Sequence, residues 1–183
     1  MQSLKGHFLV ASRYLRDSNF AQSVVLMLQH DLEGALGVVL NRPGNKTVRE
    51  VWELTGQEPC PLDDPIHVGG PVPGPLMAVH TIEELSEREI TPELFFSVER
   101  DALNRIVRHP QGRCRLFSGH AGWGSGQLEG ELKAGGWLTT AATVDDVFAD
   151  YEELWRTVVQ RIGLNIMAPG IDPERMPEDP SLN

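Results

Sequence analysis

The chain has 183 residues, a hydrophobic content of 40% and a formal net charge of −10, from 26 acidic residues against 16 Lys and Arg. The length predicts one domain, large enough to bury a core without help from a metal or a disulfide. The hydrophobic content excludes global disorder. Because the phosphates of nucleic acids repel an acidic chain, direct nucleic-acid binding is disfavoured.

Two features of the sequence predict a cytoplasmic protein that does not cross a membrane. The longest apolar run, residues 24–28, is far shorter than the roughly 20 residues of a membrane helix. The apolar stretch at residues 8–11 is too short for a signal peptide. In the cytoplasm Cys60 and Cys114 are expected to be reduced thiols. Cys60 is expected to be exposed in a loop, and Cys114 to lie in an apolar strand.

Short apolar segments bounded by turn residues predict strands. These strands are residues 7–12, 23–29, 35–41, 66–68, 76–80, 94–98, 114–118 and 137–142. The second and third are separated by a connection of hairpin length and should pair antiparallel. A Gly- and Pro-rich turn is expected at residues 69–75, and another at residues 41–44.

Capping residues mark the starts of the predicted helices. Thr47 has Glu50 at capping-box spacing and should begin the first helix. Asp101 should cap the second, which ends before Pro110. The remaining helices are expected at residues 127–133, at Thr143 with Asp146, and from Asp150 to Gly163, where apolar residues follow a 3.6-residue period.

The segment from Gly119 to Glu129 is rich in glycine, and its residues 119–126 are expected to form a loop between a strand and a helix. Such a loop can turn its N–H groups inward and bind an anion. The alternative is a tight structural turn with Trp123 folded over the sheet. The turn is favoured because acidic residues in the first turns of the next helix would repel a phosphate.

The spacing of histidines and cysteines predicts no metal site and no cofactor. No C-x-x-C, H-x-x-x-H or H-x-E pattern is present. His30, His67 and His80 lie near predicted strand ends, and separate hydrogen-bonded histidines are expected rather than a shared site. No serine or cysteine stands in a recognisable nucleophile motif.

The pattern of strands and scattered helices predicts an α+β fold, because strands and helices do not alternate regularly. The domain is expected to span residues 1–168. Residues 169–183 are rich in proline and acidic residues and are expected to form an acidic C-terminal tail.

Several segments taken in order resemble the YqgE/AlgH family of bacterial proteins. They are Gly6-His-Phe-Leu-Val-Ala-Ser12, Asp17-Ser-Asn-Phe20, Gly34-Ala-Leu-Gly37, Asn41-Arg42-Pro43, Gly69-Gly70-Pro71-Val72, Gly119-His-Ala-Gly-Trp123 and Gly126-Gln-Leu-Glu129. The resemblance implies an α+β fold with an irregular, bulged sheet that is partly closed on itself and flanked by helices. It supplies no catalytic residues, and family members are often described as transcriptional regulators.

The sequence therefore favours a non-enzymatic regulatory protein that binds an unknown protein or small-molecule partner. The alternatives are an enzyme or anion-binding protein that uses the 119–129 segment, and a DNA-binding regulator, which the net charge disfavours. A candidate binding site is predicted where the 41–43 turn and the glycine-rich segment share one surface concavity. Its residues are Asn41, Arg42, Gly119, His120, Gly122, Trp123, Gln127 and Glu129. Arg113 and Arg115 alternate along a strand and form either a solvated face or a docking patch for an acidic partner.

Overall fold

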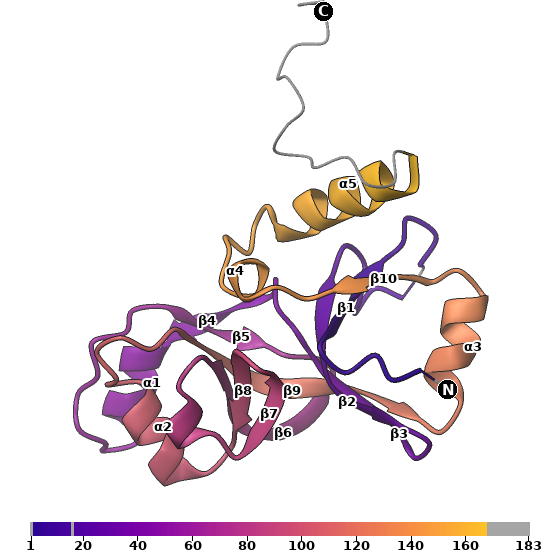
Figure 1. Cartoon of the computed structure of the whole chain (residues 1–183). Helices are drawn as coiled ribbons and strands as arrows, with labels where there is room; N and C mark the ends of the chain where they lie inside the picture. Colours follow the sequence, from indigo (N-terminus) through magenta and orange to yellow (C-terminus); the bar gives the residue numbers. More distant parts are fainter. Residues whose placement is uncertain (1, 16, 168–183) are drawn as a thin grey trace, which may run out of the picture.

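The computed structural model describes residues 2–15 and 17–167 of the chain (Figure 1). Ten strands form one sheet. They are β1 (His7–Ala11), β2 (Val24–Asp31), β3 (Gly34–Val39), β4 (Pro43–Thr47), β5 (Pro65–Val68), β6 (Val72–His80), β7 (Arg88–Thr91), β8 (Leu94–Ser97), β9 (Cys114–Gly124) and β10 (Trp137–Ala141). The helices are α1 (Val48–Leu54), η1 (Glu83–Leu85), α2 (Arg100–Ile106), α3 (Gln127–Lys133), α4 (Val144–Val147) and α5 (Leu154–Met167).

The strand order of the main path is β10-β1-β2-β3-β9-β6-β8-β7, with antiparallel neighbours throughout. β4 and β5 form a side branch, in which β5 pairs with β9 in parallel. Register shifts interrupt four of these pairings, as bulges do. The predicted α+β fold with a bulged, curled, mostly antiparallel sheet is confirmed.

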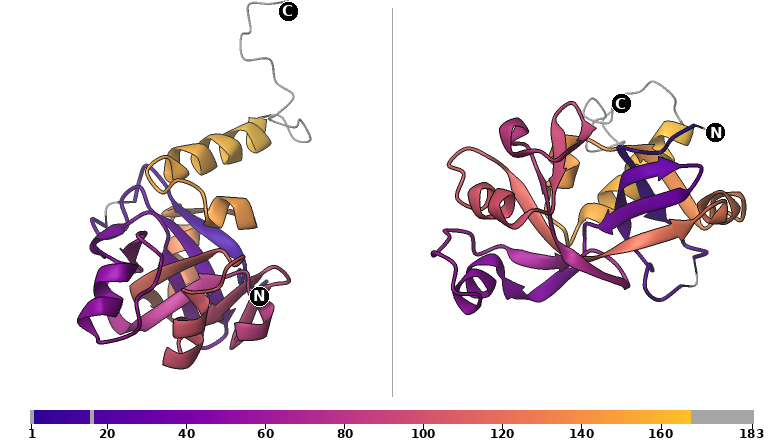
Figure 2. Two further views of the ribbon diagram at one scale, coloured as in Figure 1. Left: turned by 90° about the vertical axis from the view of Figure 1, so that its left-hand side faces the viewer. Right: turned by 90° about the horizontal axis from the view of Figure 1, so that it is seen from below.

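Strand β9 holds the two parts of the sheet together. Its last residues pair with β3, while its first residues pair with β6 on one side and β5 on the other. Figure 2 shows α3 beside one part of the sheet, and α1 with α2 beside the other. The prediction of a glycine-rich loop at residues 119–126 is wrong for most of that segment, because β9 continues through Gly124. Glycine lacks a side chain to pack, but pairing of His120 with β6 and of residues 121–124 with β3 supplies the extended conformation.

Three groups of apolar side chains form the core. The largest lies between the sheet and helices α4 and α5, and includes Phe8, Leu26, Phe117 and Val158. A second group packs α1 and α2 against β6 and β9. A third packs α3 against β1, β2 and β3. The core therefore covers both faces of the sheet, which accounts for the continuous apolar runs in β1 and β2.

The predicted capping box of α1 is confirmed. The Thr47 side chain accepts from the Glu50 N–H, and the Glu50 carboxylate accepts from the Thr47 N–H. The predicted cap at Asp101 is wrong, because the N-cap is Glu99, two residues earlier, and its side chain forms no capping hydrogen bond. The last helix also differs: it begins at Leu154 and runs through Gly163 to Met167. The predicted tail at residues 169–183 lies outside the described residues.

Two other predictions about the chain are corrected. The turn expected at residues 69–75 is shorter, because β6 already begins at Val72. Cys60, expected in an exposed loop, is buried against α1, α2 and Leu116. The prolines on both sides of Cys60 indicated a loop, but the loop passes over an apolar group that covers the thiol. Within the described part of the chain, no helix is both long and apolar enough to span a membrane.

Candidate functional site

The predicted site residues are spread along β3 and are not gathered at one end of it. Gly124 pairs with Gly34 at the start of β3, whereas Asn41 and Arg42 follow its end. The six residues of β3 span roughly 20 Å at about 3.3 Å per residue. Gln127, which follows Gly124 closely in the chain, and Arg42 therefore lie near opposite ends of β3, and the structure does not bring these two residues together. In an antiparallel pair the end of one strand lies beside the start of the other, and no local sequence pattern indicates that β3 pairs with β9.

Most polar side chains of the predicted set hold the fold together. Asn41 accepts from the Val24 N–H at 2.9 Å and donates to the Gln22 carbonyl at 2.8 Å, which joins β3 to the start of β2. Gln127 accepts from the Gly124 N–H at 3.1 Å. The Trp123 indole donates to Glu131 at 3.0 Å. These groups have partners within the chain, so their polar atoms are not free for a ligand.

Glu129 pairs with a buried histidine. The Leu4 N–H donates to His30 Nδ1 at 3.0 Å, so the ring proton lies on Nε2 and is donated to Glu129 at 3.0 Å. The pKa of Glu129 is lowered, first by a backbone N–H and then by His30. The pair fixes the N-terminal residues and α3 to β2, which explains the polarity of Glu129 without a ligand.

The other predicted residues lie along β9 and beside α5. Gly119 is buried in β9, Gly122 pairs with Leu36, and the His120 ring lies beside Gly74. Arg42 donates to the Ala21 carbonyl. It also lines a cavity of about 250 Å³ together with residues of the loop that leads into α5.

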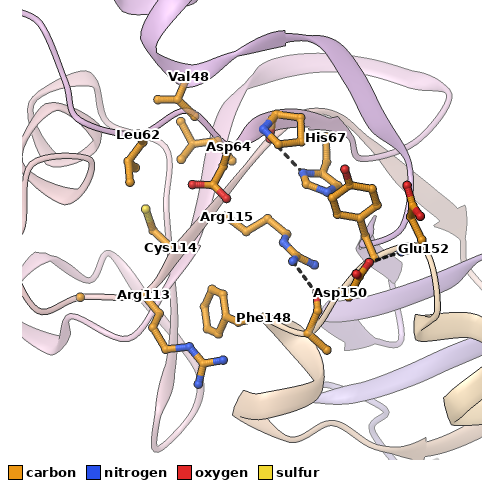
Figure 3. A pocket seen from close by; sticks show the side chains of 15 residues that line it. Val48, Leu62, Asp64, His67, Arg113, Cys114, Arg115, Phe148, Asp150 and Glu152 are labelled. Carbon is orange, nitrogen blue, oxygen red and sulfur yellow. Dashed lines mark hydrogen bonds between the residues drawn. The ribbon is translucent and has the colours of Figure 1, made fainter.

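A larger cavity, of about 590 Å³, lies between the β5–β9 pair and the connection from α4 to α5 (Figure 3). His67 comes from β5, Arg115 from β9, and Tyr151 from the connection. Parallel pairing of His67 with Phe117 brings β5 beside β9, so His67 and Arg115 become neighbours although they are far apart in sequence. Asp64, Arg113, Cys114, Phe148, Asp150 and Glu152 also line this cavity.

His67 carries a buried hydrogen-bond acceptor that has no partner. The side chain is 2% exposed, and its Nδ1–H donates to the Pro65 carbonyl at 3.1 Å. Nε2 therefore carries a lone pair, and within the described residues no donor reaches it. Tyr151 packs edge-on against the ring, with centroids 5.3 Å apart. Burial lowers the pKa of His67 to about 4, and the Arg115 cation adds to this effect, so the ring is neutral at pH 7.

Arg115 carries the matching donor. Its Nη2 donates to the Ala149 carbonyl at 2.8 Å, whereas its buried Nη1 has no acceptor among the described residues. Figure 3 shows the guanidinium extending from β9 towards His67, with Asp64 and Asp150 on either side. Burial lowers the pKa of Arg115, and the charge of Asp64 opposes this, so Arg115 remains a cation at neutral pH.

Cys114 also lines the cavity, and its surroundings make its thiol unreactive. Burial, together with the charge of Asp64, raises the pKa of Cys114 to about 12. A thiol with so high a pKa supplies almost no thiolate at pH 7. No group of three or more His, Cys, Asp or Glu in residues 2–15 and 17–167 could hold a metal ion. The arrangement can form hydrogen bonds and ion pairs with a ligand, but its groups are poorly suited to proton transfer or nucleophilic attack.

The sequence showed only parts of this site. The sequence indicates His67 as one of three histidines near predicted strand ends, and Arg115 as part of a basic strand face. The alternation of Arg113 and Arg115 indicated one strand face, and both side chains do reach the α4 region, at Asp145 and Ala149. The burial of His67 could not be read from its neighbours in sequence.

The curled antiparallel sheet with flanking helices, carrying a polar cavity beside its central strand, defines an α+β architecture that also occurs in solved structures. The family model described as AlgH-like matches residues 8–167, and the chain belongs to this family. The predicted resemblance is thus confirmed. A UPF0301 protein of Myxococcus xanthus is 37% identical over 170 residues, which cover 90% of this chain and 94% of the relative. A UPF0301 protein of Streptomyces coelicolor is 38% identical and covers 100% of this chain and 97% of the relative.

Two solved structures have the same fold. The solution structure of the AlgH protein from Pseudomonas aeruginosa has a TM-score of 0.75 and 31% identity, and the alignment covers 93% of this chain and 96% of that one. A crystal structure of protein DIP2367 from Corynebacterium diphtheriae has a TM-score of 0.71 at 24% identity, covering 88% of this chain and 87% of that one. The second likeness concerns the fold alone.

Proposed function

We propose that the chain is a non-enzymatic cytoplasmic protein that binds a small polar ligand in the cavity lined by His67 and Arg115, and that it acts in regulation through this binding. One observation carries the proposal: His67 and Arg115 line one cavity, and each carries a buried polar atom, the acceptor Nε2 and the donor Nη1, that has no partner among the described residues. An unpaired buried polar atom costs about 1–3 kcal/mol. A ligand that pairs both atoms recovers that free energy on binding.

The side chains of this cavity also favour binding over catalysis. A histidine whose pKa is lowered to about 4 is a weak base at pH 7. Cys114, whose pKa is raised to about 12, is a thiol rather than a nucleophilic thiolate. The environment that makes the cavity polar therefore also lowers the reactivity of its side chains, which supports binding over chemistry.

The alternatives receive less support. An enzyme or anion site at residues 119–129 would need free polar groups, but Trp123, Gln127 and Glu129 are paired within the chain. A DNA-binding role would need to overcome a net charge of −10. Arg42 remains part of the proposal as a neighbour of the site, because its cavity shares Tyr151 and Glu152 with the larger one.

A thermal-shift screen with a library of polar metabolites tests this proposal. Hits should raise the melting temperature of the full chain, since a ligand at 100 times its Kd adds about 2.7 kcal/mol to the free energy of unfolding. The shift should disappear in His67→Phe and in Arg115→Met. It should persist in Arg88→Met, because Arg88 is an exposed arginine that lines a different cavity. Shifts of equal size in all three variants would refute a site at the His67–Arg115 cavity.

A further inference from the structure

The unpartnered atoms of the cavity define what a ligand must offer. Arg115 Nη1 needs an acceptor, and a charged donor prefers an anionic one. His67 Nε2 is a lone pair on a neutral ring and needs an N–H or O–H donor. A simple carboxylate satisfies Arg115 but brings no donor for His67. A simple amine satisfies His67 but leaves Arg115 unpaired.

The charges around the cavity make the requirement more specific. Arg113 is already paired with Asp145, at 2.8 Å, and packs over the Phe148 ring at 4.7 Å. Arg115 forms no ion pair within the described residues. Three carboxylates line the same cavity, those of Asp64, Asp150 and Glu152.

An anion without a positive group is attracted by one guanidinium and repelled by three carboxylates. Each of these interactions weakens with distance and with screening by solvent, but three repulsions act against one attraction. A phosphate dianion is therefore a poor fit. A ligand that carries both signs of charge places its anionic group on Arg115 and its cationic group among the carboxylates.

Size and surface agree with a small organic molecule. The cavity volume of about 590 Å³ lies inside the range of roughly 300–1,000 Å³ found for small-molecule sites. Phe148 and Tyr151 supply aromatic surface on the side of the α4–α5 connection. The volume accommodates a free amino acid or a peptide of two residues, with an apolar side chain against these rings.

We infer that the ligand is a small zwitterion with a carboxylate and a primary ammonium group, the chemistry shared by α-amino acids and short peptides. The carboxylate accepts from Arg115 Nη1. The ammonium donates to His67 Nε2 and is attracted by the carboxylates that line the cavity. This assignment rests on the proposed function, because it names the ligand class of the same cavity.

Matched probes separate the two charges. Calorimetric titrations of the full chain at pH 7.5 should compare phenylalanine with 3-phenylpropanoate, which lacks the ammonium group, and with 2-phenylethylamine, which lacks the carboxylate. A panel of the other amino acids and of dipeptides extends the comparison and distinguishes a free amino acid from a peptide. The best zwitterion should bind at least about tenfold more tightly than either of its halves, since each lost group leaves a buried partner unpaired. Inorganic phosphate should bind more weakly still.

Variants and one spectroscopic signal locate the binding. Zwitterion affinity should fall at least about tenfold in His67→Phe and in Arg115→Met, and should be unchanged in Arg88→Met. The Nε2 resonance of ¹⁵N-labelled His67 should shift on titration, because its lone pair acquires a donor. A purely structural role of His67 would leave this resonance in place.

The outcomes distinguish the two proposals. Equal or tighter binding of 3-phenylpropanoate or of phosphate, with a shifted His67 resonance, would overturn the zwitterion while the cavity remained a ligand site. If no amino acid or dipeptide binds at 10 mM while the thermal-shift screen finds ligands of another class, the zwitterion proposal is likewise overturned and the cavity remains a ligand site. Zwitterion binding that neither moves the His67 resonance nor weakens in the two variants would overturn both.

Discussion

Replacing His67 by phenylalanine should stabilise the chain or leave its stability unchanged, although the residue is 98% buried (2% exposed). The substitution removes one hydrogen bond, from Nδ1–H to the Pro65 carbonyl, worth about 1 kcal/mol. It also removes the unpartnered Nε2, which costs about 1–3 kcal/mol in the ligand-free protein. The edge-on contact with Tyr151 is available to a phenyl ring as well. The net change in the free energy of unfolding is expected between about 0 and +2 kcal/mol.

His80 offers a matched control. It is fully buried, and both ring nitrogens are paired: Nδ1 accepts from the Ile82 N–H at 3.2 Å, and Nε2–H donates to the Ser97 hydroxyl at 3.0 Å. His80→Phe therefore removes two hydrogen bonds and leaves the Ile82 N–H buried without a partner. A loss of about 2–4 kcal/mol is expected.

Urea unfolding at pH 7.5 without ligand measures both effects, since each imidazole is neutral there. The two variants should differ by at least about 2 kcal/mol, or by roughly 4–8 °C in melting temperature for a chain of this size. If His67→Phe destabilises as much as His80→Phe, then Nε2 has a partner in the native protein. The observation that supports the proposed ligand site would then be lost.

Three further predictions concern titration, thiol reactivity and backbone packing. Burial lowers the pKa of His67 and of His80 from 6.5 to about 4. Between pH 6.5 and pH 4 the unfolded chain therefore binds more protons than the folded chain. The free energy of unfolding should fall as the pH is lowered through this range. Urea unfolding at pH 7 and pH 4.5 should show a drop of about 1–2 kcal/mol per histidine, and each phenylalanine variant should show a smaller drop; a flat profile would contradict the burial of these rings. Cys114, with a pKa raised to about 12, should react with a thiol reagent at pH 8 at least about a hundredfold more slowly in the native than in the urea-unfolded chain, and equal rates would contradict the high pKa. Gly70→Ala should destabilise the chain by more than about 3 kcal/mol, because its φ is +155° and a Cβ would lie 2.3 Å from the backbone of β9. Gly126 has φ +74° but open space around it, so Gly126→Ala should cost about 1 kcal/mol. Equal unfolding midpoints of the two variants in urea would refute this contrast.

The elements predicted correctly from the sequence are those that a local pattern determines. The apolar runs of β1, β2 and β3 and the Thr47–Glu50 capping box are complete within a few residues. Strands β4 and β7 were missed because their side chains are mostly polar and they pair along one side only. Their extended conformation comes from a neighbouring strand rather than from their own pattern.

Strand β9 likewise owes the extended conformation of its second half to neighbouring strands and not to its own residues. Its second half contains three glycines, which are typical of a loop. Pairing with β3 and β6 overrides this preference, and the register of those pairs decides which residues become neighbours. The sequence therefore located the glycine-rich segment but not the strand pairing, and a candidate site built on the loop joined residues that lie at opposite ends of β3.

The His67–Arg115 cavity could not be predicted either, because it too depends on strand pairing. Each residue has an ordinary local setting, and only the parallel pairing of β5 with β9 places an unpartnered acceptor near an unpartnered donor. Burial in this place keeps the imidazole neutral, as the lowered pKa of His67 shows, while the lowered pKa of Arg115 still leaves a cation. The fold thus holds a neutral acceptor and a charged donor at fixed positions. Such a pair discriminates ligands by the groups they bring, because a molecule that lacks either group leaves a buried atom unpaired.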